Sequence, residues 1–299
     1  MNDAPFPKSC PSDASGAVPS GTSPNPKESF EETAFQLYAY EFSWDIEKSL
    51  QFALFRTYAV PEISRLLATT GEFETRPRKR YDDTELILAE IIEHGLDSPR
   101  GVRSIARMNA MHARFRIRDD DMLYVLSTFI CEPIRWLDQF GRRPMTETER
   151  RAWFKYYRGL GARMGIRDLP DDLADLMRWN ESYERERFRF AETNNRIATA
   201  TRDLFLSFYL PRWLNSAGRP VVNAVLDTSL LESMGFAAPP QWLRHAVFAG
   251  LRLRARALRW LPRHHRPRRL TQLPRPTYPE GYRIEELGTF AKAKGTCER

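Results

Sequence analysis

The sequence predicts an all-α protein, organised as a single globular domain of roughly ten helices. From Trp44 onward, apolar residues recur at intervals of three and four, which is the period of an amphipathic helix. No stretch alternates convincingly between apolar and polar residues with the period of two that half-buried strands show. Glycines and prolines lie at the spacing of helix ends.

The composition of the first 29 residues differs from that of the rest. They are rich in Pro, Ser, Gly and Ala and contain almost no large apolar residue, so they cannot bury enough surface to offset the entropy of ordering. We expect residues 1–29 to be a disordered tail, residues 30–290 to form the helical domain, and residues 291–299 to be a disordered C-terminal end.

Proline, glycine and capping residues mark the ends of the first helices. Residues 45–59 carry an apolar stripe, and residues 61–71 read as a short helix that begins at a proline and ends at a glycine. A charged connector, 72–81, follows. The next helix is expected to begin at a capping box of Asp82 and Glu85 and to end at the following glycine.

The later helices are located in the same way. The helix after Asp119–Asp121 is apolar nearly all round in its first half, which indicates a buried central helix. Pro133 should bend it or follow a break. Thr146 and Glu149 form a second capping box. These signals predict helices over residues 98–115, 121–141, 149–165, 172–190, 191–209, 218–234 and 239–261.

Charge and cysteine usage restrict the class of protein. The net charge is +7, and ten arginines with no acidic residue lie between Ser233 and Pro279. Removing those ten charges from +7 leaves −3 for the rest, so the basic character is confined to one segment. The three widely spaced cysteines include no Cys-x-x-Cys pair, which argues against a disulfide framework or a zinc knuckle and favours a reducing compartment.

The segment 98–115 carries the most informative side chains. At 3.6 residues per turn, one helix face would hold apolar, amide, imidazole and guanidinium groups: Ile105, Met108, Asn109, His112, Phe115 and Arg116. Haem ligation uses such a mixture. A neutral imidazole binds iron, an acceptor fixes its other nitrogen, apolar neighbours keep the porphyrin dry, and arginines neutralise the propionates.

A simpler explanation of His112 stands beside this one. A single histidine on a half-apolar helix is more often a hydrogen-bonded core residue, and no second histidine or carboxylate follows at i+3 or i+4 to complete a metal pair. His94 lies at a helix C-terminus, where it would cap the dipole. His264 and His265 lie in an arginine- and proline-rich loop. The pattern alone therefore leaves both explanations open.

Several long segments of the chain resemble the catalytic domain shared by the ER-bound oxygenase MpaB and the rubber oxygenases, or latex-clearing proteins. The block around His112, ARMNAMHARFRIRDDD, continues into LYVLSTFICEPIRWLDQF, and both are long and specific. Further matching segments are FRTYAVPEISRLLATTGEF, RKRYDDTEL, ATRDLFLSFYLPRW and TYPEGYRIEELG. Together they span about residues 44–288, and the resemblance is closer to MpaB than to the latex-clearing proteins.

The resemblance implies a helical domain that holds one haem b in a central pocket. His112 stands in the position of the family's proximal iron ligand. Arg116 matches an arginine that lies four residues beyond that ligand in the family. Asn109 and Arg107 are further cofactor-binding candidates, which could orient the imidazole or bind a propionate.

The resemblance also implies distal catalytic residues. The latex-clearing branch has an Arg-x-x-Lys-Thr element on the distal side, which Arg80 and Thr84 match, whereas Asp83 replaces the lysine. This reversal of charge argues against natural rubber as the substrate. Capping of a helix start, where Asp and Thr favour the dipole, is an alternative explanation of Asp83 and Thr84.

The basic segment, which includes the arginines from Arg252 to Arg269, alternates arginine with Leu, Ala and Trp. A helix packed on the domain with one solvated face explains it most simply. The alternative is contact with an anionic membrane surface. No motif that reads nucleic acid is present, so no nucleic-acid partner is expected. Neither a secretory signal nor an apolar run of membrane-spanning length is visible, so we expect a cytoplasmic protein, with peripheral membrane association as the alternative.

Two classes of function follow. The first is a haem-dependent oxygenase that uses dioxygen to oxidise or cleave a carbon–carbon double bond of an apolar, isoprenoid-like substrate. The second is a non-catalytic haem-binding or membrane-surface module of the same fold, which the departure at Asp83 keeps open. A nucleic-acid-associated protein that uses the arginine cluster is a third and weaker alternative.

Overall fold

The computed structural model describes residues 26–261 and 266–288, with side chains from residue 30 onward. Within those residues it contains thirteen α-helices, short π and 3₁₀ turns, and no β-strand, which confirms the predicted all-α class. The helices are α1 (Pro26–Gln36), α2 (Ser43–Tyr58), α3 (Pro61–Thr69), α4 (Glu72–Thr75), α5 (Pro77–His94), α6 (Pro99–His112), α7 (Asp119–Phe140), α8 (Glu147–Arg163), α9 (Leu173–Arg187), α10 (Glu192–Ser207), α11 (Asn215–Asn223), α12 (Thr228–Met234) and α13 (Gln241–Leu258).

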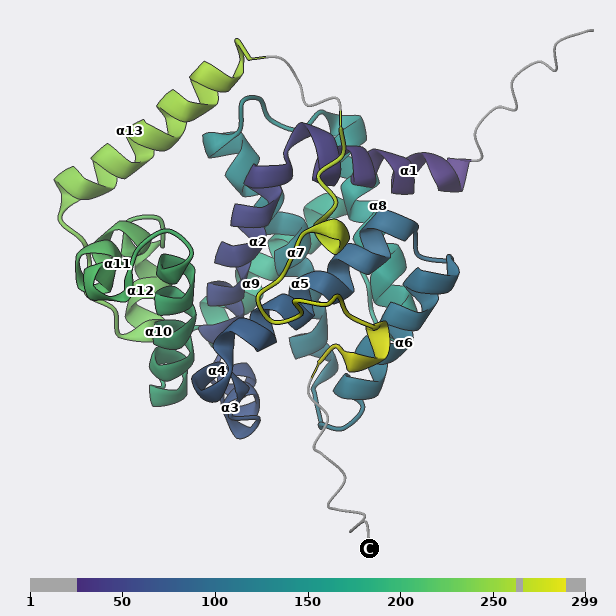
Figure 1. Cartoon of the computed structure of the whole chain (residues 1–299), viewed down its shortest axis with the longest axis horizontal. Coiled ribbons are helices and arrows are strands. Elements are labelled where there is room, and N and C mark those ends of the chain that lie inside the picture. The colour runs from purple at the N-terminus through teal and green to yellow at the C-terminus, as the bar shows by residue number, and fades with distance from the viewer. Residues whose placement is uncertain (1–25, 262–265, 289–299) are drawn as a thin grey trace, which may run out of the picture.

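The helices surround a central pair, α2 and α7, which pack along each other (Figure 1). As predicted, α7 is mostly buried, and Pro133 lies inside it without ending it. The indole of Trp136 on α7 stacks on Phe52 of α2 at 5.5 Å between ring centroids and donates a hydrogen bond of 3.1 Å to Asp45. Helices α5 and α6 pack together on one side of this pair, while α10 to α12 form the opposite side (Figure 1).

Polar side chains cap the starts of three predicted helices. The hydroxyl of Ser98 accepts from the Gly101 N–H at 2.9 Å at the start of α6. The capping box of Thr146 and Glu149 begins α8, with both of its reciprocal hydrogen bonds present. The carboxylate of Asp172 caps α9. These groups satisfy N–H donors that the first helical turn leaves without partners.

The predicted capping box of Asp82 and Glu85 is wrong. Helix α5 begins earlier, at Pro77, and takes in the second half of the predicted connector, while α4 occupies its first four residues. Asp82 is fully buried in the interior of α5, where Arg78 pairs with it at 2.9 Å. The start of this helix is therefore stabilised by a proline in its first turn and by ion pairs between residues four apart. It has no side-chain cap.

The structure differs from the prediction in helix count after α10, and it describes the predicted ends of the chain only in part. Residues 218–234 form two helices, α11 and α12, because Asp227 caps a new start. Residues 1–25 of the predicted tail lie outside the described residues, and α1 begins at Pro26. The loop histidines His264 and His265 and the predicted C-terminal end also lie outside the described residues.

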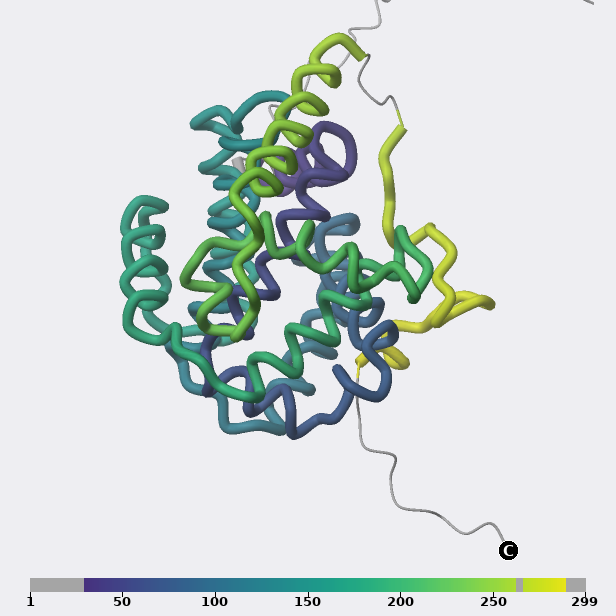
Figure 2. The backbone as a smooth tube through the Cα atoms, turned by 90° about the vertical axis from the view of Figure 1, so that its left-hand side faces the viewer, coloured from purple at the N-terminus to yellow at the C-terminus, as the bar shows by residue number. Residues whose placement is uncertain are grey.

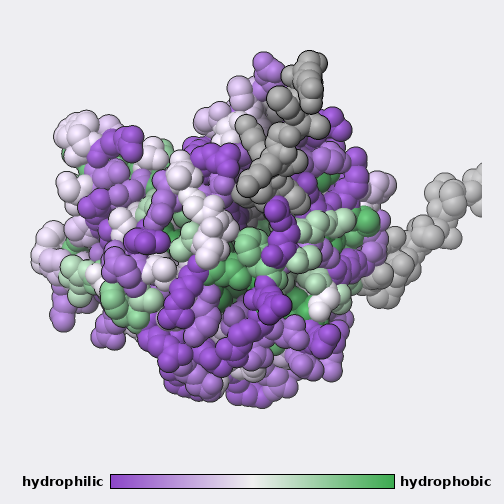
Figure 3. All heavy atoms as spheres, turned by 90° about the horizontal axis from the view of Figure 1, so that it is seen from below, coloured by the Kyte–Doolittle hydropathy of each residue, from purple (hydrophilic) through white to green (hydrophobic). Residues whose placement is uncertain are grey.

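Helix α13 lies along the outside of the molecule (Figure 2). It contacts α7 and α11, and Ala255 is its one buried residue. Among the described residues, no helix combines the length and the apolar composition needed to cross a membrane. The face seen from below is largely hydrophilic, with a band of hydrophobic side chains at its centre (Figure 3).

Candidate functional site

His112 is the last residue of α6, a helix that packs against α5, and the residue is half-buried. The Nδ1 atom is buried and has no hydrogen-bond partner within the described structure. Burial, followed by the positive charge of Arg80, lowers the pKa of the imidazole from 6.5 to about 4. The ring is therefore neutral near pH 7, with one nitrogen lone pair available to bind a metal.

Arg80 and Thr84 face this site from α5. Burial lowers the pKa of the Arg80 guanidinium, which donates a hydrogen bond to the Thr84 hydroxyl and lies 5.3 Å from the centre of the Phe73 ring. The Thr84 hydroxyl also bonds back to the Arg80 carbonyl at 3.0 Å. The charge of Arg80 acts on His112, and Thr84 is hydrogen-bonded to Arg80, so Arg80 links the ligand candidate to the other distal candidate.

The other three candidates point elsewhere. The Asn109 side chain donates to the Arg163 carbonyl at 2.9 Å and so fixes α6 to α8. Arg107 donates from Nε to the Leu287 carbonyl at 2.7 Å. Arg116 is exposed, because α6 ends at His112 and the predicted face does not continue to it. The shared face of residues 105–116 is thus wrong beyond His112.

Asp83, which replaces the family's lysine, serves neither as a cap nor as an exposed charge. It is buried in the middle of α5, where Lys79 pairs with it at 2.7 Å and the Tyr278 hydroxyl donates to it. Its carboxylate is therefore neutralised on the side of α5 that the C-terminal segment covers. The negative charge of Asp83 is thus balanced by Lys79 on the same helix.

This C-terminal segment, residues 266–288, runs across α5 and reaches α6 (Figure 1). It supplies partners for buried carboxylates on α5. The Leu270 N–H donates to Glu93 at 2.6 Å, and the Tyr282 hydroxyl donates to Glu90 at 2.6 Å. The last residue of the segment, Gly288, has a φ of +84°, which residues with a side chain rarely adopt, and it closely approaches the Met111 side chain. The end of this segment thus packs against Met111, the residue that precedes His112.

Sequence reasoning missed the residues that surround Arg80. Tyr58 on α2 is buried, which raises the pKa of its hydroxyl to about 12 even though the neighbouring Thr201 on α10 lowers it. Phe73 on α4 packs against Tyr58 at 5.6 Å between ring centroids. Both aromatic residues lie in the segment FRTYAVPEISRLLATTGEF, which resembles the family. The contact of Phe73 with Arg80, however, depends on the packing of α4 against α5.

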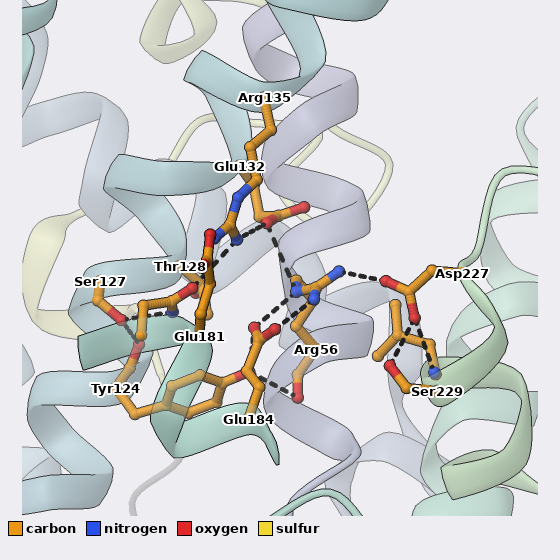
Figure 4. A network of polar contacts seen from close by, with 12 residues as sticks. Arg56, Tyr124, Ser127, Thr128, Glu132, Arg135, Glu181, Glu184, Asp227 and Ser229 are labelled. Atoms are coloured by element: carbon orange, nitrogen blue, oxygen red, sulfur yellow. Dashed lines mark hydrogen bonds and ion pairs between the residues drawn. The ribbon is translucent and has the colours of Figure 1, made fainter. Parts of the chain in front are cut away.

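A second polar cluster lies between α2, α7, α9 and α12 (Figure 4). At its centre, Arg56 binds Glu184 through two hydrogen bonds, pairs with Asp227 at 2.7 Å and lies 3.4 Å from Glu132. The Tyr124 hydroxyl donates to Glu184 at 3.1 Å. Every charge in the cluster has a partner, so we interpret it as a structural network that ties four helices together.

Two cavities lie away from His112. The larger, about 590 Å³, is lined by residues of α9 and α12 and by the chain between α9 and α10, and includes Glu184. The smaller, about 340 Å³, is lined by residues of α10, α11 and the segment before α13, and includes Arg202. No residue of α5 or α6 lines either cavity, so both are separate from the group around His112.

Comparison with known proteins places the chain in a family. Residues 50–268 match the family described as "ER-bound oxygenase mpaB/B'/Rubber oxygenase, catalytic domain". The chain is 32% identical over 231 residues to the ER-bound oxygenase mpaB' of Penicillium brevicompactum, a match that covers 71% of this chain and 54% of the relative. It is 31% identical over 227 residues to the ER-bound oxygenase mpaB of Penicillium roqueforti, covering 68% of this chain and 76% of the relative.

A third match, at 34% identity over 163 residues, is to the ER-bound oxygenase mpaB of Penicillium brevicompactum, and it covers 48% of this chain and 41% of the relative. The chain therefore spans about half the length of two of these relatives. The family match extends from α2 to beyond α13 and includes Arg80, Thr84 and His112. The chain belongs to the family of the ER-bound oxygenase mpaB/B' and rubber oxygenase catalytic domains.

Proposed function

We propose that the protein is a haem b-dependent oxygenase that oxidises or cleaves a carbon–carbon double bond of an apolar, isoprenoid-like substrate. Its family consists of oxygenase catalytic domains. The observation that carries the haem proposal is the buried Nδ1 of His112, which has no partner among the described residues. Leaving a buried polar atom unpaired costs about 1–3 kcal/mol, a cost that a bound ligand would remove.

The residues present fit a haem group. His112 would bind the iron, because its imidazole is neutral near pH 7 and its Nδ1 is unpartnered. Arg80 forms no ion pair with a carboxylate in the described part of the chain, so this cation suits an anionic or polarised group. When bound, haem would supply the iron chemistry that activates dioxygen.

The chain's own residues would position and shield the reacting groups. Arg80 would present its remaining N–H donors near His112, while the Thr84 hydroxyl accepts from Arg80 and holds its guanidinium in place. Tyr58 and Phe73 pack around Arg80 and keep water from it. Met111 and the end of the C-terminal segment close the side of α6 next to His112. Such a dry setting strengthens each hydrogen bond to a reacting oxygen.

The test is a reconstitution followed by product analysis. Haemin added to the purified protein should give a Soret band at one haem per chain. The reduced, haem-loaded protein should then convert a prenylated aromatic compound to aldehyde or acid products in the presence of dioxygen. Failure to bind haemin would contradict the whole proposal. Haem binding without turnover of a panel of prenyl compounds would favour the non-catalytic haem-binding alternative.

We further propose that α13 attaches the protein to an anionic membrane surface. The relatives are named ER-bound. On α13 and just beyond it, large hydrophobic side chains are exposed: Trp242 at 69%, Leu253 at 66% and Trp260 at 90%. Arg252 and Arg256 are exposed beside them. Tryptophan and arginine on an exposed amphipathic helix favour the membrane interface.

Replacing Arg252 and Arg256 together with glutamine should weaken binding to vesicles that contain anionic lipid by about tenfold or more, since each basic residue near the surface contributes about 1 kcal/mol. Co-sedimentation at two salt concentrations measures this. Arg254 is unsuitable for the test, because it pairs with Asp45 at 2.9 Å and stacks on Trp44.

The matched control replaces Arg151 and Arg178, which are exposed on α8 and α9. This pair changes the net charge by the same amount and should bind vesicles almost as the unmodified protein does. Equal losses in the two double variants would show that net charge, rather than α13, determines binding.

A further inference from the structure

The smaller cavity contains a buried cation with incomplete partners. Arg202 on α10 is 7% exposed and lines the cavity of about 340 Å³. Its Nε atom is buried without a hydrogen-bond partner, while one terminal nitrogen donates to Asn223 Oδ1 at 3.0 Å. The Phe236 ring lies 3.9 Å from the guanidinium carbon. A buried arginine normally has a carboxylate partner, and this one has none among the described residues.

Asp203, the residue next to Arg202, does not neutralise the Arg202 guanidinium. Asp203 is bound through both oxygens by Arg219, at 3.0 and 2.7 Å. Burial accordingly lowers the pKa of the Arg202 guanidinium to about 10. It is still protonated near neutral pH, so a positive charge is kept in the interior beside an open space.

The cavity lining suits one kind of ligand. It contains two arginines, Arg202 and Arg219, and no acidic side chain. Its apolar part consists of Pro220, Phe236, Ala237, Ala238, Pro239 and Pro240. An arginine edge binds carboxylates through parallel hydrogen bonds, and cavities of this size and mixed lining hold small molecules.

The geometry points to a binding site for a small carboxylic acid with a short apolar chain, held by Arg202 in the cavity between α10, α11 and the segment before α13. The carboxylate pairs with the Arg202 guanidinium, and the apolar chain contacts Phe236 and the prolines. The site is separate from His112, because no residue of α5 or α6 lines this cavity. The inference therefore does not depend on haem binding.

A purely structural role for Arg202 is the competing explanation. The hydrogen bond to Asn223 and the contact with Phe236 also join α10, α11 and the segment after α12. Both explanations predict that a substitution of Arg202 lowers stability, so stability cannot decide between them. Only direct ligand binding separates them.

Calorimetric titration of the full chain with hexanoate, hexanamide and inorganic phosphate provides the test. Hexanoate should bind, and the neutral hexanamide should bind at least tenfold more weakly. Arg202→Gln should weaken hexanoate binding at least tenfold. Arg178→Gln, an exposed arginine on α9, should leave it unchanged.

A second variant tests the site if Arg202→Gln does not fold. Ala238 is exposed and lines the cavity, so Ala238→Phe should block the space while Arg202 remains in place, and hexanoate binding should again fall at least tenfold. Absence of hexanoate binding to the unmodified protein would overturn the inference. So would equal binding by every variant that folds, or binding of phosphate in place of hexanoate.

Discussion

Replacement of His112 by alanine should abolish haem binding. The substitution removes the one nitrogen that we assign to iron, and even loss of a residue that only orients a metal ligand weakens binding by about 10–100-fold. We expect the Soret band of the reconstituted protein to disappear in His112→Ala. The free energy of unfolding without haem should change little, because the buried Nδ1 has no partner to lose.

Two further variants test whether the loss of haem is specific to His112 and to its role as a ligand. His94→Ala removes a histidine at the end of α5 that contacts the Glu90 carbonyl at 3.1 Å, and this variant should keep its haem. In His112→Gly, added imidazole should restore a Soret band by occupying the vacated position, which a purely structural role would not predict. A His112→Ala protein that retains one haem per chain would contradict the assignment.

Replacement of Arg56 by methionine should destabilise the fold more than any other single change considered. Arg56 faces Glu132, Glu184 and Asp227, and of these Glu132 also pairs with Arg135 at 2.8 Å. Removal of Arg56 leaves the buried Glu184 without a cation, at a cost of about 3–5 kcal/mol. Urea unfolding should therefore show a large decrease in the midpoint. Lowering the pH from 7 to 5 should reduce the deficit, because protonation removes the uncompensated negative charges.

Arg178→Met is the matched control for Arg56. Its partner, Asp175, lies three residues away on the same helix, and the Arg178 side chain is 71% exposed. Pairs of this kind contribute less than about 1 kcal/mol. Similar losses in the two variants, or a loss in Arg56→Met that does not depend on pH, would show that packing of the arginine side chain rather than its charge explains the effect.

Local signals in the sequence predicted most of the fold. The apolar period of the helices and the capping groups of Ser98, Thr146 and Asp172 act within a few residues, so they can be recognised without knowing the packing. The start of α5 was misplaced because Asp82 looks like a cap in sequence. In the fold its partners include Arg275, almost 200 residues later, at 3.5 Å. Tertiary ion pairs of this kind have no local signal.

The candidate site was predictable only in part, for the same reason. The resemblance identified Arg80, Thr84 and His112 one by one, and the structure brings them together. Arg116 and Asn109 were placed on the same face by extending the helical period, but α6 ends at His112 and Asn109 faces α8. The packing of Tyr58 and Phe73 around Arg80 depends on three helices, so no periodicity could reveal it.

The C-terminal segment has a consequence for how the chain is made. Three of its residues bind carboxylates on α5 that were synthesised about 190 residues earlier. Tyr278 binds Asp83, Tyr282 binds Glu90, and Arg275 binds both Asp82 and Glu85. During synthesis, the acidic groups of α5 therefore have only their local partners, such as Arg78 and Lys79, until the segment emerges, since domains complete their non-local contacts only when both parts are available. A nascent chain stalled before residue 270 should be far more sensitive to protease across α5 than one released after residue 288.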